Sequence, residues 1–328
     1  IIFLGNQKYQ VSILNQSKED YTWKLIREYD HFYIKNMKNE KYLIDALKQK
    51  ALIPRYCVED IDYLKIKRDD TSFKSVAVLQ KCFCDIPLSK LFERTKVHVT
   101  DWPKDLSAED KTRIRVKTEL GMTHLDCYGY FALAFPKNWG ERNNIQPVQY
   151  INITAEEAFS YAAALSNIIS CNGSYGDEVV EYFLNRVCFM KPLRGSMIRD
   201  FDLTGRKISI PITKNFHNEC EWRYVPLSAQ LKGTMLEKII AVPSIVTDDI
   251  RLKSISSGIT QKIYEKMWLK FKYEDIKYII VPNPQSRVNI INLIRTVVAD
   301  ENNSEKVSAT QDLLISKILV ISEMNGDL

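Results

Sequence analysis

The 328-residue sequence lacks any apolar run near the roughly 18 residues that a membrane-spanning helix needs, and its mean hydropathy is −0.24. Residues 1–5 are apolar but carry neither a basic leader nor a small-residue cleavage site, so no signal peptide is expected. Charge of either sign is barely in excess, since 46 Lys and Arg against 41 Asp and Glu give +5. That value is small for a dedicated nucleic-acid binder. We therefore predict a soluble cytoplasmic protein with no membrane partner, for which nucleic acid is a weak candidate partner.

Several motifs of known chemistry are also missing. The sequence has no glycine-rich phosphate loop, HExxH zinc motif, GxSxG nucleophile motif or EF-hand loop. Its seven cysteines are an odd number and mostly stand in apolar runs such as 187–189, which favours buried free thiols over disulfides. The pairs Cys82/Cys84 and His124/Cys127 place soft ligands close together but lack regular zinc spacing. We expect no metal cofactor.

The order of the expected elements is not the strict alternation of a doubly wound fold. It predicts an α+β protein with an N-terminal helical segment over residues 1–30 and a domain over 31–328. That domain has a central, mostly antiparallel sheet and a helical insertion at about 154–200. Strands are expected at 31–34, 75–88, 128–135, 147–152, 207–212, 221–227 and 277–282, and helices at 17–28, from about 39, from 154, and at 177–189, 287–298 and 311–322.

The segment 219–226, with the sequence Glu-Cys-Glu-Trp-Arg-Tyr-Val-Pro, is the most informative local pattern. Side chains alternate on an extended strand, so Glu219, Glu221 and Arg223 should share one face. Two carboxylates beside a guanidinium form either a solvated sheet edge or the lining of a cleft, and the solvated edge is favoured.

Two further strands carry polar residues beside aromatic ones. His31 and Tyr33 share one face of the expected strand 31–34, where the histidine is either bound by a backbone carbonyl or functional. Asp85 lies close to Phe83 at the end of an apolar strand, where an aspartate is often only a turn or cap residue. The structural role is favoured in both places.

These segments, with others, also carry a family resemblance. The sequence resembles the AbiGi family of abortive phage-infection proteins and, more distantly, a bacterial domain of unknown function, in order over about residues 30–325. The matching stretches are His31-Phe32, 52–60, 82–88, 128–130, 137–140, 144–148, 219–226 and 271–281. The resemblance implies a two-gene antiphage system that sacrifices the infected cell. In that system the AbiGi member is described as an antitoxin, beside a toxin that resembles a nucleotidyltransferase.

A second, weaker resemblance concerns mechanism. A histidine on the first strand, a helix followed by Leu-Ile-Pro, and a late Glu-x-Glu strand are similar to the layout of ADP-ribosyltransferases. This resemblance implies NAD+ as cofactor. Glu221 would stabilise the positive charge that develops on the ribose, Glu219 would orient the acceptor, and His31 would hold a ribose hydroxyl.

The same resemblance implies the cofactor-binding residues. Tyr33 or Phe83 would stack on the nicotinamide, and Asp85 and Arg223 complete the expected set. Two functions therefore stay open. One is an NAD+-using effector with ADP-ribosyltransferase or NAD+ glycohydrolase activity, and the other is a non-catalytic antitoxin that binds and neutralises a cognate toxin.

Overall fold

The computed structural model describes residues 2–4, 7–9, 32–68, 71–170, 176–203, 206–298 and 304–324. The chain is α+β with a mostly antiparallel central sheet, as the sequence predicts. The expected helix 17–28 and His31 lie outside the described residues. Among those that are described, no helix combines the length and the apolar character needed to cross a bilayer.

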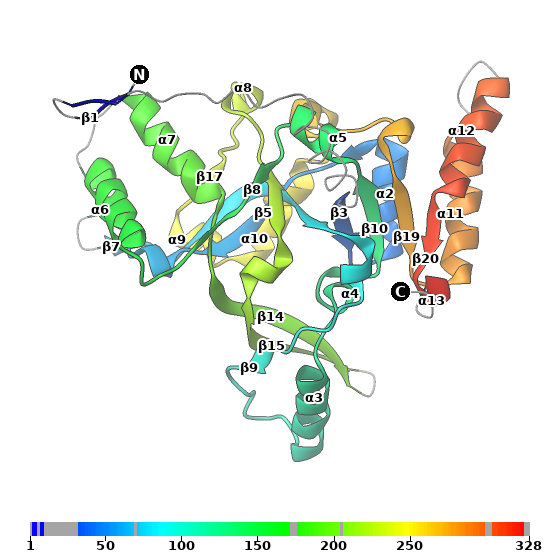
Figure 1. Ribbon diagram of the computed structural model, residues 1–328, viewed down its shortest axis with the longest axis horizontal. Coiled ribbons are helices and arrows are strands. Elements are labelled where there is room, and N and C mark those ends of the chain that lie inside the picture. Colours follow the sequence, from blue (N-terminus) through cyan, green and yellow to red (C-terminus); the bar gives the residue numbers. More distant parts are fainter. Residues whose placement is uncertain are drawn as a thin grey trace.

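The central sheet is built around the long strand β8 (Figure 1). Its path runs β11-β16-β8-β3-β10-β19-β20, and β5 and β17 also pair with β8. All of these pairs are antiparallel except β19 with β20. The strands are β3 (Phe32–Met37), β5 (Arg55–Asp60), β8 (Ser75–Ile86), β10 (Phe131–Phe135), β11 (Gln146–Pro147), β16 (Glu221–Tyr224), β17 (Ile239–Ile240), β19 (Tyr278–Val281) and β20 (Ile318–Val320).

Two strands, β5 and β3, pair with successive parts of the same edge of β8. β5 pairs with it as far as Gln80, and β3 pairs with it only from Cys84 onward. Within the described residues, neither strand pairs with positions 81–83 on this side. The central sheet therefore has an opening between β3 and β5, and both candidate sites described below lie at this opening.

The helix α2 (Glu40–Gln49) connects β3 to the next strand and begins at the expected position, directly after Asn39. The side chain of Asn39 accepts a hydrogen bond from the backbone of Tyr42, which satisfies a free N–H of the first turn. Leu43, Ala46 and Leu47 are buried against the sheet, as their spacing predicts.

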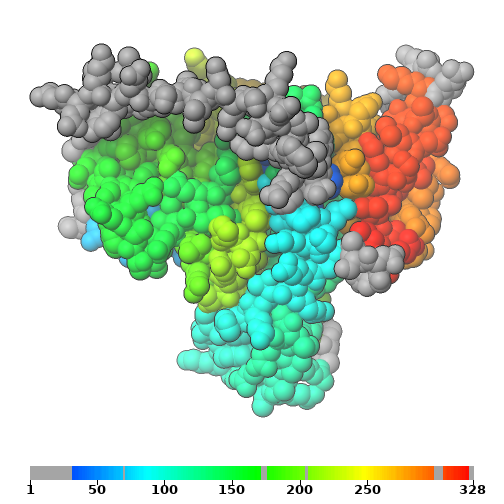
Figure 2. All heavy atoms as spheres, viewed as in Figure 1, coloured from blue at the N-terminus to red at the C-terminus, as the bar shows by residue number. Residues whose placement is uncertain are grey.

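The helical insertion is shorter than predicted. The helices α6 (Glu156–Ser170) and α7 (Asp177–Cys188) form as expected, but residues 190–192 and 194–200 lie in strands. Residues 194–200 belong to β14 (Arg194–Leu203), which forms a hairpin with β15 (Arg206–Asn215). This hairpin extends away from the central sheet together with β9 (His98–Val99) and α3 (Ala108–Leu120) (Figures 1 and 2).

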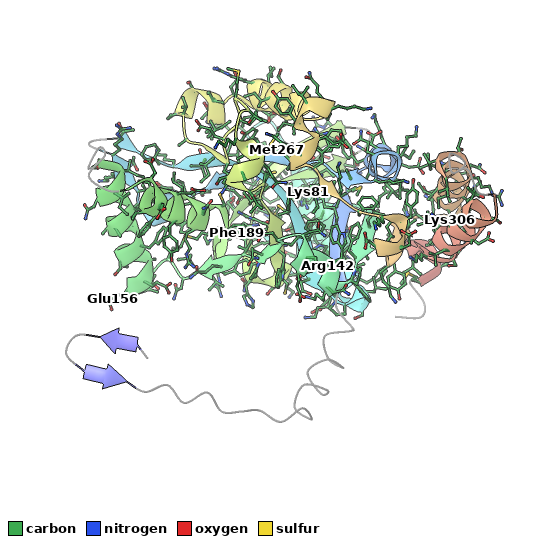
Figure 3. The ribbon with its side chains drawn as sticks, turned by 90° about the horizontal axis from the view of Figure 1, so that it is seen from above. Lys81, Arg142, Glu156, Phe189, Met267 and Lys306 are labelled. Carbon is green, nitrogen blue, oxygen red and sulfur yellow. The ribbon has the colours of Figure 1, made fainter. Side chains whose placement is uncertain are left out.

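The helices α11 (Pro284–Val297) and α12 (Ser304–Ser316) lie at the end of the molecule opposite α6 and α7 (Figures 1 and 3). The predicted helix 311–322 is interrupted after Ser316, because residues 318–320 form β20 and extend the sheet beside β19, and a helix resumes only at Ile321. The predicted strand 128–135 begins only at Phe131, after the short helix α4 (His124–Tyr128).

The other described elements are short and connect these parts. They are β1 (Ile2–Leu4), β2 (Gln7–Tyr9), β4 (Ala51–Leu52), β6 (Lys67–Arg68), β7 (Thr71–Ser72), β12 (Gln149–Ile151), β13 (Met190–Pro192), β18 (Leu269–Lys270), α5 (Lys137–Arg142), α8 (Ser228–Leu231), α9 (Pro243–Val246), α10 (Asp249–Gly258), α13 (Ile321–Met324), η1 (Asp62–Leu64), η2 (Leu88–Leu91), η3 (Phe216–Glu219), η4 (Lys262–Met267) and η5 (Tyr273–Asp275).

Candidate functional site

A cavity of about 270 Å³ lies at the opening in the sheet, on the face that carries Glu221. Acidic, basic and thiol side chains from β5, β8, α4, β13 and β16 contribute to its lining, together with apolar side chains such as those of Ile34 and Phe83. Its polar lining includes Glu59, Gln80, Cys82, Cys84, His124, Tyr128, Lys191, Glu219 and Glu221.

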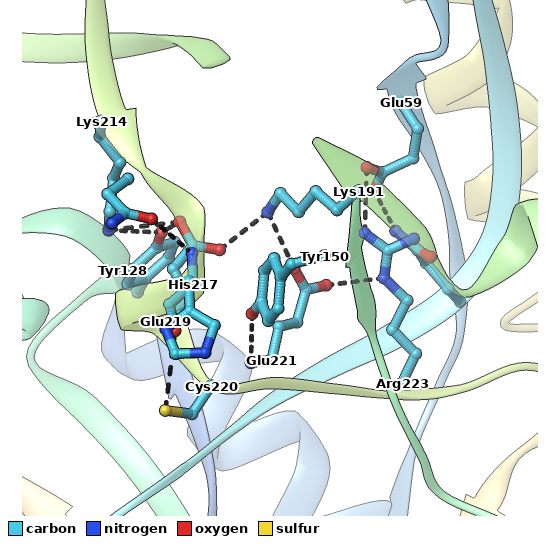
Figure 4. A network of polar contacts seen from close by, with 12 residues as sticks. Glu59, Tyr128, Tyr150, Lys191, Lys214, His217, Glu219, Cys220, Glu221 and Arg223 are labelled. Carbon is cyan, nitrogen blue, oxygen red and sulfur yellow. Dashed lines mark hydrogen bonds and ion pairs between the residues drawn. The ribbon is translucent and has the colours of Figure 1, made fainter. Parts of the chain in front are cut away.

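Lys191 joins the two carboxylates that the sequence singled out (Figure 4). Its Nζ donates to Glu219 Oε2 at 2.7 Å and to Glu221 Oε2 at 2.8 Å. Arg223 Nε donates to the other oxygen of Glu221 at 2.8 Å, and Arg223 Nη2 lies 3.0 Å from Glu59 Oε2. Two cations therefore link three glutamates, and Glu221 is paired with both of them.

The remaining oxygen of Glu219 is also occupied. The Tyr128 hydroxyl donates a short hydrogen bond to Glu219 Oε1, and Lys214 Nζ lies 3.2 Å from the same oxygen. Lys214 Nζ also donates to the Tyr128 hydroxyl oxygen at 3.0 Å. All four carboxylate oxygens of Glu219 and Glu221 thus have a hydrogen-bonding or ionic partner.

The favoured interpretation of this segment as a solvated edge is wrong. Glu219, Glu221 and Arg223 are 3%, 7% and 0% exposed, because β16 is an internal strand between β11 and β8. The simple alternation also fails at Glu219, which lies at the end of the turn η3, before the strand begins. Cys220 between them has a left-handed backbone (φ 43°), and this turn still directs both carboxylates to Lys191.

Neighbouring groups of opposite charge determine the ionisation of Glu221 and Lys191. Burial by itself would raise the pKa of Glu221, but the charges of Arg223 and Lys191 outweigh it and hold that pKa well below its usual range. Burial would likewise lower the pKa of Lys191, and Glu221 and Glu219 instead raise it. Glu221 is therefore paired as an anion at neutral pH.

This arrangement predicts a specific loss of stability in acid. Because the pKa of Glu221 in the folded state lies below the unfolded value of about 4.3, its ionisation stabilises the protein above pH 4.3. This stabilisation is lost progressively as the pH falls from that value toward the folded-state pKa. Glu221→Gln removes this contribution. We expect the urea midpoint of the wild type to fall more steeply than that of Glu221→Gln below about pH 4.3. Parallel curves for the two proteins would contradict the ion pairing.

Two cationic side chains, those of Lys214 and Arg199, lie beside the ring of Tyr128. Lys214 Nζ and the Arg199 guanidinium lie 4.8 Å and 5.4 Å from the centre of its ring, and Arg199 is 5% exposed. Burial, together with the charges of Lys214 and Arg199, lowers the pKa of the neighbouring His124 to about 3. His124 is therefore neutral near pH 7.

The sheet separates the other predicted residues from these carboxylates. Directly paired residues point to the same face, and the pairs Glu221/Cys84 and Trp222/Phe83 alternate along the strand. Phe83 therefore projects to the face opposite Glu221. It borders the cavity, but its ring packs in the core 6.1 Å from that of Trp139.

Tyr33 and Asp85 pair with one another on the face that Phe83 occupies. The Tyr33 ring is 1% exposed and lies 5.1 Å from that of Trp222, with Lys137 Nζ 4.6 Å from its centre. Lys137 also forms an ion pair with Asp85. The predicted set thus forms two groups, Glu219, Glu221 and Arg223 on one face of the sheet and Tyr33, Phe83 and Asp85 on the other, and His31 lies outside the described residues.

The residues do not fit the NAD+ arrangement that the resemblance implies. The aromatic rings expected to stack on nicotinamide are buried on one face of the sheet, and the carboxylates expected to act on the ribose lie on the other. Neither carboxylate has an oxygen left without a partner. The described residues also contain no group of three His, Cys, Asp or Glu side chains placed to bind a metal ion.

The sequence patterns missed the residues that complete this network: Glu59, Tyr128, Lys191 and Lys214. Glu59 and Tyr128 lie in stretches that carry the AbiGi resemblance, and that resemblance is the sequence feature by which they could have been found. Lys191 stands between Met190 and Pro192, and nothing in its local sequence distinguishes it from a surface lysine.

Comparison with known proteins agrees with the resemblance. A family described as abortive phage resistance protein AbiGi, antitoxin, matches residues 118–282. An abortive phage resistance protein AbiGi from Lactococcus lactis subsp. cremoris is 34% identical over 286 residues, which cover 84% of this chain and 99% of that protein. No solved structure matches the chain. The length and the identity of this match show that the chain belongs to the AbiGi family of abortive phage resistance proteins.

Proposed function

We propose that this chain is the antitoxin of an abortive-infection system and neutralises a toxin protein by binding it, without catalysis of its own. The family supports a role in antiphage defence, and its description includes the word antitoxin. The observation that carries the non-catalytic part is the full pairing of all four oxygens of Glu219 and Glu221.

The pairing argues against glycosidic cleavage for a physical reason. A carboxylate lowers the barrier only if its charge is directed at the cation that develops on the sugar. In this chain the charge of Glu221 is already neutralised by Arg223 and Lys191. A network of this kind positions β13 against β16 and suits a structural role better than a catalytic one.

The variant Glu221→Gln distinguishes a non-catalytic antitoxin from an NAD+-using enzyme. Each cation keeps a carboxylate in this variant, because Lys191 retains Glu219 and Arg223 retains Glu59. We expect Glu221→Gln to fold, to co-purify with the toxin encoded in the same system, and to restore growth of cells that express that toxin. Millimolar NAD+ should leave the melting temperature of the wild type unchanged.

The matched control is Glu265→Gln, which changes an exposed glutamate paired with Lys270. It should behave as the wild type in every assay. The proposal fails if folded Glu221→Gln loses growth rescue while Glu265→Gln keeps it. It also fails if NAD+ raises the melting temperature of the wild type and not that of Glu221→Gln.

A further inference from the structure

A second and larger cavity, of about 380 Å³, lies at the same opening in the sheet. It is bordered by the end of β3, by α2, by the chain from β4 to the start of β5, and by Lys81 of β8. We call it the basic cavity. Lys81 lies near the centre of the molecule when viewed from above (Figure 3). Lys35, Asn36 and Tyr128 line both this cavity and the smaller one described above.

Four cationic side chains line the basic cavity, and three of them lack a carboxylate partner. In the described part of the chain, Lys35, Arg55 and Lys81 form no ion pair, while Lys38 Nζ lies 3.4 Å from Asp200. Lys81 Nζ donates to the carbonyl oxygen of Ile53 at 3.1 Å, which leaves its charge unbalanced.

Acidic groups do not compensate for these charges. The single carboxylate that lines the basic cavity, among the residues described, is Asp45. It is already paired with Lys41 at 2.7 Å. Lys81 is a partly buried cation beside two others, and proteins normally pair such groups. The cavity is therefore complementary to an anion.

The ionisation of Lys81 reflects the same imbalance. Burial, together with the charges of Lys35 and Arg55, lowers the pKa of Lys81 to about 7. An anion bound among the three groups would remove the mutual repulsion and favour the charged lysine.

The rest of the lining matches a ligand larger than a simple ion. Tyr42, at 49% exposed, and Tyr128 contribute aromatic rings, and Asn36, Gln49 and Thr260 contribute groups that form neutral hydrogen bonds. The volume lies in the range typical of sites for small molecules.

We propose that the basic cavity binds a small phosphate-bearing molecule, with Lys35, Arg55 and Lys81 contacting the phosphate oxygens. This site adjoins the cavity of the paired carboxylates, with which it shares Lys35, Asn36 and Tyr128, and it does not depend on the antitoxin role. Free phosphate, pyrophosphate and nucleotides share this chemistry, and the binding experiment distinguishes among them.

The test is isothermal titration of the full purified chain with phosphate, pyrophosphate, ATP and adenosine in turn. Pyrophosphate or ATP should bind, and adenosine should not. A preference for ATP over pyrophosphate that Tyr42→Ala removes identifies a nucleotide as the ligand, and equal affinities identify the phosphate groups alone. Absence of binding by all three phosphate compounds at millimolar concentration overturns the proposal.

Two variants locate the site. Lys81→Met and Arg55→Met should each weaken ATP or pyrophosphate binding about tenfold or more, because each removes a charged contact. Arg55 is exposed, so its variant should fold even if Lys81→Met does not. Lys253→Met, which alters an exposed lysine paired with Asp249, makes the same change in net charge and should bind as the wild type. Equal affinities in all four proteins would show that the anion binds elsewhere.

Discussion

Arg223→Met is expected to lower the free energy of unfolding by about 3–5 kcal/mol. Arg223 is 0% exposed and is the cation placed between Glu221 and Glu59. Methionine fills part of the volume but leaves both carboxylates beside one another without their shared cation, and an uncompensated buried charge is strongly destabilising. Equilibrium urea unfolding, followed by circular dichroism at neutral pH, measures the effect.

Two controls make this result specific. Lys253→Met removes one cation from an exposed pair on α10 and should change the free energy of unfolding by no more than about 0.5 kcal/mol. Adding Glu221→Gln to Arg223→Met removes one of the two carboxylates that have lost Arg223, restores the charge balance of the network, and should recover part of the loss. A loss for Arg223→Met no larger than that for Lys253→Met would mean that the network does not stabilise the fold.

Gly129→Ala should destabilise the protein by about 3–5 kcal/mol, through backbone strain and overpacking together. Gly129 follows α4 and has φ of +115°, a conformation that residues with a side chain rarely adopt. An added Cβ would also collide with the backbone carbonyl of Met37, which cannot rotate away as a side chain can. Urea unfolding measures this loss as well.

This glycine matters for the site because it holds α4 against β3. Its carbonyl accepts a hydrogen bond from Asn36 Nδ2 at 3.0 Å, and the preceding residue, Tyr128, lines both cavities. Gly258→Ala is the matched control. Gly258 is the last residue of α10, and no atom lies within 4 Å of an added Cβ. Alanine there should be neutral or stabilise the protein by up to about 1 kcal/mol. Similar losses in both variants would contradict the role of the contact with Met37.

Local patterns predicted the elements whose signals lie within a few residues. Asn39 and the spacing of Leu43, Ala46 and Leu47 are enough to predict α2, since a cap and an apolar stripe are properties of consecutive residues. The apolar run 75–88 likewise predicted β8. The same reasoning failed at 318–320, because a short apolar run is compatible with either a helix or a strand, and here the neighbouring β19 decided.

The candidate site divides in the same way. The local sequence is enough to predict that Glu219, Glu221 and Arg223 stand close together, and the resemblance it carries identifies the family. Their burial and pairing follow from the fold, because Lys191 and Tyr128 lie 28 and 91 residues before Glu219 in the sequence. The fold also placed Tyr33 and Phe83 across the sheet from Glu221, and it gathered Lys35, Arg55 and Lys81 around one cavity. The physical reason is that the charge a residue meets depends on which strands and turns lie beside it, and local periodicity contains no information on that choice.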